Sequence, residues 1–295
     1  MSAVGRVRVE RSVWFGEAEL LPDPHRDAGW TVAVDGVTQS FVDLADPTYL
    51  KLPYVAWIGQ AIDRHWPPGT AVSATYLGGA GCTLPRYVAA TRPGSEQTAF
   101  ELDEPLVELV REHLALDEVP GLEVRVQDGR AGVRDAQDDS ADLVVLDVFR
   151  AGSVATELAT VEFLSEIARV LRPGGLFAAN IWDGGELPFA LGAFASVCEV
   201  FPHVLVLAEP AVLLRRRAGN IVVVASTRDL PRAGLDAWGA AAANRMSCLT
   251  PRQLAAVAGT APPITEANPH TGQVPPVRHP REQRDLNGNQ RSDFH

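Results

Sequence analysis

A glycine-rich turn and an acidic residue are spaced along the sequence as in a pocket for a nucleoside. The turn reads Gly78-Gly79-Ala80-Gly81 and follows an apolar run. Glycines let a ligand approach backbone N–H groups at the start of a helix. Glu101 ends the next apolar run, where a carboxylate can accept hydrogen bonds from both hydroxyls of a ribose. A tight turn beside an exposed acid is the alternative, because a glycine-rich loop alone is weak evidence.

Two aspartates follow later apolar runs. Asp128, with Gly129 after it, could accept a hydrogen bond from an adenine amino group, and a simple Asp-Gly turn is the alternative. Asp147 ends the apolar stretch DLVVLDV, where a carboxylate is costly to bury without a partner. Ligands of open α/β sheets bind at such strand ends. Asp147 is therefore predicted to hold a cationic amine or take a proton from one, with a structural role as the alternative.

The sequence lacks the residues that several other kinds of chemistry require. A dinucleotide fingerprint expects a third glycine near position 84, where Leu84 stands, and this disfavours a nicotinamide cofactor. The sequence has no GxSxG elbow, no HExxH and no metal-ligand histidine spacing, so neither a hydrolase triad nor a metal is predicted. The arginines at 215–217 are more typical of a solvated charge run. Trp182, near the end of a predicted strand, could line the substrate side.

The composition favours a cytoplasmic protein. The 295 residues carry a formal net charge of −11, which argues against a nucleic-acid surface and suits a cationic substrate. The three cysteines are far apart, as expected in a reducing compartment rather than in a disulfide framework. The N-terminal stretch has no apolar core, and no apolar run reaches the ~20 residues of a membrane helix. We expect no nucleic acid and no membrane among the partners.

The first part of the chain must form a separate small unit. Apolar and polar residues alternate through residues 7–41, and Asp35-Gly36 lies between two of the apolar runs. This pattern is typical of β-hairpins. We predict an antiparallel N-terminal domain over residues 1–52.

Alternating strand and helix patterns follow over residues 53–228. The predicted strands are residues 71–77, 97–102, 122–126, 142–148 and 176–181. The predicted helices are residues 54–62, 83–90, 104–116, 160–171 and 187–198, with Thr83 as the N-cap of the second. Parallel strands need crossover helices, so this order predicts a doubly wound α/β sheet.

The sheet is predicted to end in an antiparallel hairpin. Short apolar runs at residues 204–207, 212–215 and 220–225 are interrupted by Ala218-Gly219-Asn220, a turn sequence. Two helices are expected over residues 229–260. The Pro-, Asn-, Arg- and His-rich residues 261–295 are expected to be disordered.

These residues resemble the spermidine synthase (polyamine aminopropyltransferase) family over roughly residues 34–226. The matching segments are residues 34–39 with Gln39, Tyr49, 78–84, 101–103, 128–130, 143–147 and 171–175. The resemblance implies a class I methyltransferase-like (Rossmann-like) fold and S-adenosylmethionine, or its decarboxylated form, as cofactor. It implies that Gln39 and Glu101 contact the cofactor, Asp128 its adenine, and Asp147 the attacking amine. The family commonly forms dimers, which leaves a homodimer as one option.

Three positions depart from the family pattern. Ala80 stands where the family has an aspartate facing the aminopropyl end of the decarboxylated cofactor. Arg150 stands where a second aspartate would meet the far ammonium of a diamine. Leu50 replaces the histidine expected after Tyr49. Ala80 removes a carboxylate that would repel the carboxylate of intact S-adenosylmethionine, and Arg150 suggests an acceptor with an anionic group.

Three hypotheses follow. The favoured one is a transferase that uses intact S-adenosylmethionine, most simply a methyltransferase acting on a small-molecule acceptor, in which Asp147 orients or deprotonates the nucleophile. The second is an aminopropyltransferase with an altered amine site. The third is a non-catalytic nucleoside-binding homologue, against which the retention of Glu101, Asp128 and Asp147 speaks mildly.

Overall fold

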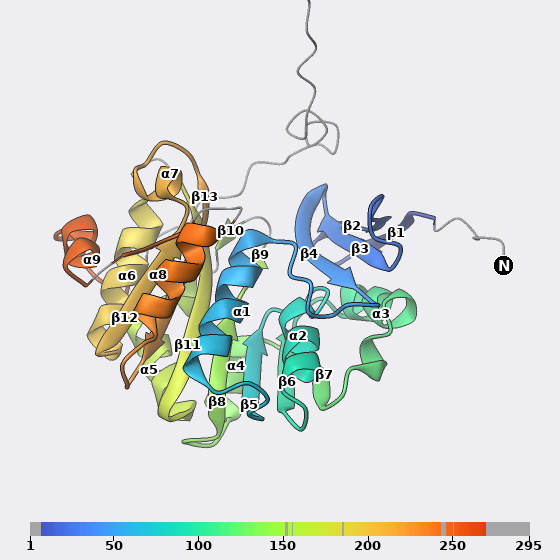
Figure 1. Ribbon diagram of the computed structural model, residues 1–295, viewed down its shortest axis with the longest axis horizontal. Helices are drawn as coiled ribbons and strands as arrows, with labels where there is room; N and C mark the ends of the chain where they lie inside the picture. Colours follow the sequence, from blue (N-terminus) through green and yellow to red (C-terminus); the bar gives the residue numbers. More distant parts are fainter. Residues whose placement is uncertain are drawn as a thin grey trace, which may run out of the picture.

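Two β-sheets form most of the fold. The computed structural model of the chain describes residues 7–150, 153–154, 156–184, 186–242, 246–249 and 251–269. The N-terminal sheet contains four antiparallel strands in sequence order, β1 to β4. They are β1 (Val9–Val13), β2 (Gly16–Pro22), β3 (Gly29–Val34) and β4 (Val37–Asp43). The period-2 alternation therefore predicted this sheet correctly, and Figure 1 shows it beside the larger sheet.

The larger sheet has eight strands in the order β14-β12-β13-β11-β8-β5-β6-β7. Its strands are β5 (Ser73–Leu77), β6 (Glu96–Glu101), β7 (Leu122–Val126), β8 (Ala141–Leu146), β11 (Leu171–Asp183), β12 (His203–Ala208), β13 (Gly219–Ser226) and β14 (Ser247–Leu249). The five strands from β11 to β7 are parallel, and β13 is antiparallel to both of its neighbours. This arrangement confirms the Rossmann-like prediction. A two-stranded hairpin, β9 (Phe149–Arg150) and β10 (Ser153–Val154), follows β8.

Helices cover both faces of this sheet (Figure 1). One face packs against α1 (Pro53–His65), α2 (Thr83–Thr91), α3 (Glu104–His113) and α8 (Arg232–Ala241). The other packs against α4 (Gly129–Asp135), α5 (Val161–Val170), α6 (Pro188–Val200) and α9 (Pro251–Ala258). Both sheet faces are buried, which explains why the parallel strands are apolar throughout rather than alternating.

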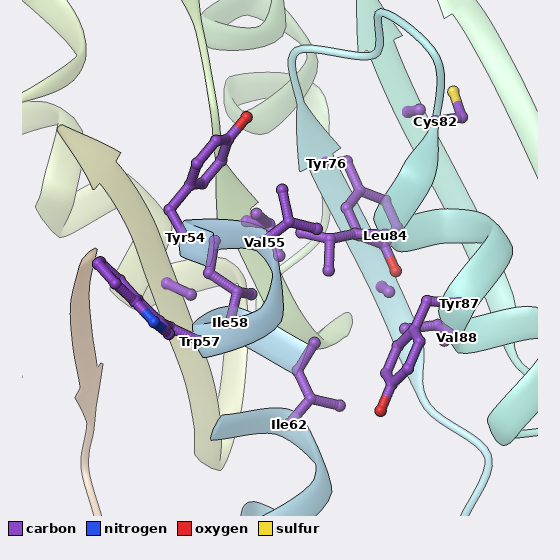
Figure 2. Close-up of a cluster of buried hydrophobic side chains, with 14 of the residues drawn as sticks. Tyr54, Val55, Trp57, Ile58, Ile62, Tyr76, Cys82, Leu84, Tyr87 and Val88 are labelled. Carbon is purple, nitrogen blue, oxygen red and sulfur yellow. The ribbon is translucent and has the colours of Figure 1, made fainter. Parts of the chain in front are cut away.

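The helix α1 is anchored by its apolar side. Figure 2 shows Ile58 and Ile62 packed in a buried cluster with Leu84 and Val88 of α2. Tyr54 lies in the first turn of α1, and its ring is directed away from Ile58 and Ile62. This anchoring fixes the position from which Tyr54 reaches the site described below.

Several local predictions were wrong. Residues 210–213 form a short helix, α7 (Pro210–Leu213), instead of a strand over 212–215, because proline is favoured in the first helical turn. Cys82, not Thr83, is the N-cap residue of α2, and the Thr83 hydroxyl donates to the carbonyl of Phe41. The helix α4 and the strand β14 were not predicted.

The C-terminal region is ordered further than expected. Ile264 is fully buried against the α5–α6 side of the sheet, and its N–H donates to the Ser196 hydroxyl at 2.7 Å. Thr265 and Asn268 form an isolated bridge. The prediction of disorder from residue 261 is therefore wrong for residues 261–269, and residues 270–295 lie outside the described part. Among the helices of the described residues, none has the length and apolarity needed to cross a membrane.

Candidate active site

A cavity of about 880 Å³ lies at the carboxyl ends of the parallel strands, beneath the N-terminal sheet. Its walls come from the turn after β5, the ends of β6, β8 and β11, the start of α4 and the first turn of α1. This volume lies within the usual range for small-molecule sites, about 300–1,000 Å³. The cavity brings together most of the residues selected from the sequence: Gln39, Gly78, Gly79, Ala80, Glu101, Asp128, Gly129, Asp147 and Trp182.

The glycine-rich turn is shaped by close backbone approaches. Gly78 has a φ of +92°, and a Cβ there would lie 2.1 Å from the carbonyl oxygen of Asp147. A side chain at this position would therefore force the strand ends apart. Gly81 does not line the cavity: its N–H donates to the Ser40 hydroxyl at 3.1 Å, and a Cβ there would meet Ser40 and Val42 of β4. Gly81 is thus explained by packing against the N-terminal sheet.

Glu101 holds this turn in place. Its Oε2 accepts the N–H groups of Gly79 and Ala80 at 2.8 and 3.0 Å, and its Oε1 accepts those of Leu102 and Asp103 at 2.8 and 3.1 Å. A carboxylate has about four lone-pair sites, so these four bonds use its capacity. A ribose could bind Glu101 only by replacing some of these backbone bonds.

Asp128 begins a helix rather than a simple turn. Its Oδ1 accepts the N–H of Ala131 at 3.0 Å as the N-cap of α4. Gly129 packs against Leu77, since a Cβ there would lie 3.1 Å from the Leu77 Cγ. Both Asp128 and Gly129 line the cavity, and a helix N-terminus beside a carboxylate offers both donors and acceptors to a polar ligand.

Asp147 lines the cavity just after β8. The Tyr54 hydroxyl donates to its Oδ2 at 3.2 Å, and the Asn180 amide donates to its Oδ1 at 2.9 Å. Burial raises the pKa of this carboxyl from 3.8 to about 6, although the hydrogen bonds from Asn180 and Tyr54 act in the opposite direction. A carboxyl with a pKa near 6 is suited to accept a proton at neutral pH.

Asn180 and Tyr54 were missed as site residues in the sequence. Asn180 is 3% exposed and lines the cavity, and its Oδ1 has no hydrogen-bond partner among the described residues. A buried acceptor without a partner is unfavourable by about 1–3 kcal/mol. A ligand N–H in the cavity would satisfy it. The sequence gave one signal for Asn180: it is a single amide in an otherwise apolar run near the end of a predicted strand.

The three residues predicted to contact the substrate, Tyr49, Arg150 and Trp182, do not all line the cavity. Trp182 lines the cavity on β11. Tyr49 does not: it is 38% exposed, and its ring packs edge-on against Phe41 under the guanidinium of Arg26. The prediction for Tyr49 is therefore not supported by its position. Arg150 lies in the hairpin after β8, and its side chain is outside the described part.

Gln39 and the cavity's charge complete the geometry. Gln39 lines the cavity and its amide donates to the Val37 carbonyl at 3.3 Å. The carboxylates in the wall are Glu19, Asp35, Glu101, Asp103, Asp128, Asp147 and Glu209, whereas the arginines are Arg130 and Arg217. This excess of negative charge favours cationic ligands. Within the described ranges, no group of three metal-ligating side chains is present.

Comparisons with known proteins agree with this geometry. Residues 77–179 match the family model described as a methyltransferase domain. A polyamine aminopropyltransferase of Halorhodospira halophila is 32% identical over 105 residues, which are 34% of this chain and 37% of that protein. One of Korarchaeum cryptofilum is 34% identical over 95 residues, or 30% of this chain and 29% of that protein. A probable spermidine synthase from Corynebacterium glutamicum superposes with a TM-score of 0.82 at 29% identity, covering 89% of this chain and 97% of that one.

The chain is similar to spermidine synthases in sequence and in fold. This similarity confirms the resemblance inferred from the motifs, and the match to the Corynebacterium structure covers 89% of this chain. The matched segments span less than two fifths of the curated relatives' lengths. The activity and substrates of this protein are therefore proposals that rest on its own site.

Proposed function

We propose that the protein transfers an aminopropyl group from decarboxylated S-adenosylmethionine to the nitrogen of an amine. The observation that carries the proposal is Asp147: a cavity-lining carboxyl with a pKa raised to about 6 and an unpartnered amide oxygen beside it on Asn180. The curated relatives named polyamine aminopropyltransferase support this reading better than methyl transfer, which the sequence alone favoured.

The residues present fit an adenosyl group. The Gly78–Gly79 backbone passes so close to Asp147 and Glu101 that added Cβ atoms would meet them, and the acids around it suit a cation. Glu101 would hold the ribose after exchanging backbone bonds, while Asp128, Gly129 and Gln39 would line the nucleoside. When bound, the adenosyl sulfonium supplies an electrophilic carbon and a sulfur that leaves as a neutral thioether.

The chain's own groups prepare the nucleophile. An amine that enters as an ammonium donates one N–H to Asp147, which takes the proton and leaves the nitrogen lone pair free to attack. The carbon–nitrogen bond forms as the carbon–sulfur bond breaks, with its electron pair passing to sulfur. Tyr54 and Asn180 keep the Asp147 carboxylate in place, and Asn180 Oδ1 accepts a second N–H of the amine. The proton leaves Asp147 to solvent after transfer.

Methyl transfer is the second candidate, and Ala80 is the observation that favours it. Position 80 has no carboxylate to repel the carboxylate of intact S-adenosylmethionine. The Ala80 N–H, however, is already bound by Glu101, so it is not free to hold that carboxylate either.

A paired binding and turnover experiment tests the proposal. The protein is titrated calorimetrically with S-adenosylmethionine and with its decarboxylated form, and then incubated with each cofactor and a panel of amines. We expect tighter binding of the decarboxylated form and release of a thioether nucleoside with an aminopropylated product. Tighter binding of the intact form together with a methylated product would establish the second candidate instead. Binding without any product would establish a non-catalytic role.

A further inference from the structure

The cavity extends past Asp147 along the carboxyl edge of the sheet. The cavity-lining residues on this side include Asp147, Asn180, Trp182, Asn220, Glu209 and Arg217, and we call this part of the cavity the acceptor branch. The strand register orders these residues. Ala179 pairs with Leu146, Ile181 pairs with Ile221, and Ile221 pairs with Ala208, which directly precedes Glu209. Three interstrand steps separate β8 from β12, so the branch spans about 14 Å of sheet.

The near end of the branch is built for an N–H donor. The carboxylate of Asp147 and the unpartnered Oδ1 of Asn180 lie together, because the Asn180 amide is itself bound to Asp147. Asn180 is 3% exposed, so water reaches it poorly outside the cavity. A primary amine would supply the missing hydrogen bond.

The far end has a different charge character. Glu209 forms an ion pair with Arg217, and Arg215 of the same connection pairs with Glu186. Arg216 between them is exposed. Among the cavity-lining residues at this end one arginine, Arg217, stands against one glutamate, Glu209, whereas acids prevail in the cavity as a whole.

The second ammonium group of a diamine acceptor would bind poorly at this end. Its natural partner, Glu209, is already paired with Arg217, and the guanidinium of Arg217 would repel a second ammonium. A carboxylate group of the acceptor would bind better here, because a guanidinium has five N–H donors and binds carboxylates in a planar fork. The described contact with Glu209 uses Nη2 of Arg217.

We propose that the acceptor is an amino carboxylate: a primary amine that docks at Asp147 and Asn180, joined to an anionic group that docks at Arg217. The inference deepens the proposed function and rests on it for the reaction, but not for binding.

The test compares ω-amino carboxylates with α,ω-diamines of equal chain length as acceptors, over lengths up to the branch span. We expect kcat/KM at least about tenfold higher for the amino carboxylate. Arg217→Gln should abolish that advantage, and Glu209→Gln should keep or increase it. Arg216→Gln on the same exposed connection is the matched control, with an unchanged ratio. A wild-type preference for diamines, or equal losses in Arg217→Gln and Arg216→Gln, would overturn the assignment.

A binding measurement separates this inference from the proposed function. Each acceptor is titrated calorimetrically into protein saturated with a thioether nucleoside. If no amine is alkylated with either cofactor, the proposed function fails, while binding of amino carboxylates that Arg217→Gln weakens would still support the docking site. If amines are alkylated but amino carboxylates bind no more tightly than diamines, the function stands and the docking site is refuted.

Discussion

Replacing Asp147 by asparagine should raise the stability of the protein and lower its activity. A carboxyl whose pKa rises from 3.8 to about 6 on folding costs the folded state up to about 3 kcal/mol once it is ionised. Because the cavity brings solvent to this half-buried residue, we expect about 1–3 kcal/mol. Asparagine keeps the shape, can accept from Asn180 and can donate to Tyr54. Asp147→Asn should therefore stabilise the protein while removing the proton acceptor, which lowers kcat by about 10²–10⁴-fold.

The raised pKa of Asp147 determines how the stability difference between Asp147→Asn and the wild type changes with pH. Below the unfolded pKa of 3.8 the carboxyl is protonated in both states and costs nothing. Between 3.8 and about 6 the folded state binds more protons than the unfolded state, so the free energy of unfolding of the wild type falls as pH rises. Above about 6 the full cost remains. The advantage of Asp147→Asn should thus be small near pH 4 and largest near pH 8.

Urea titrations across this range, together with initial rates, measure both effects. Asp142→Asn, at the other end of β8, is the matched control. Asp142 accepts from Ser73 N–H at 2.7 Å and from Arg172 at 2.8 Å, so its replacement should lower stability and leave kcat unchanged. A stability difference for Asp147→Asn that is the same at every pH, or a loss of stability near pH 8, would refute the reasoning about Asp147.

Three further variants test the same site. Ala80→Asp should shift the ratio of the two cofactor dissociation constants about tenfold toward the decarboxylated form, and equal changes in both constants would contradict this. Tyr54→Phe removes a hydrogen bond that lowers the pKa of Asp147, so the acidic limb of kcat/KM should move above about 6; an unmoved limb would count against a proton-accepting Asp147. Glu101→Gln should weaken binding of a thioether nucleoside at least about tenfold and lower Tm, because the Gly79 turn loses its acceptor. A lower Tm with unchanged nucleoside binding would make Glu101 purely structural.

Most of the fold was predictable because the two periodicities of the chain are clear. Alternation through residues 7–41 yields the N-terminal sheet, and fully apolar runs mark strands that are covered on both faces. The failures occur where a short apolar run fits either element. Residues 212–215 have no periodicity that separates strand from helix, and Pro210 decides in favour of α7. The Pro-Gly-Gly at 173–175 forms an irregularity within β11, just after α5 ends.

The site was predictable to the extent that it consists of acids at strand ends. Glu101, Asp128 and Asp147 share one cavity because parallel strands end at one edge. The partners of Asp147 were not predictable from local patterns. Asn180 becomes its neighbour only through the pairing of β11 with β8, and Tyr54 only through the packing of α1.

Cofactor choice depends on the charge of the whole cavity as well as on position 80. Both cofactor forms are sulfonium cations, so the acids in the wall favour both. The intact form adds a carboxylate, which would enter a wall where seven acids face two arginines, and the nearest turn N–H groups are held by Glu101. Loss of one acid at Ala80 reduces this repulsion without reversing its sign. The decarboxylated form should therefore be preferred already in the wild type, and a carboxylate at position 80 should increase an existing preference rather than create one.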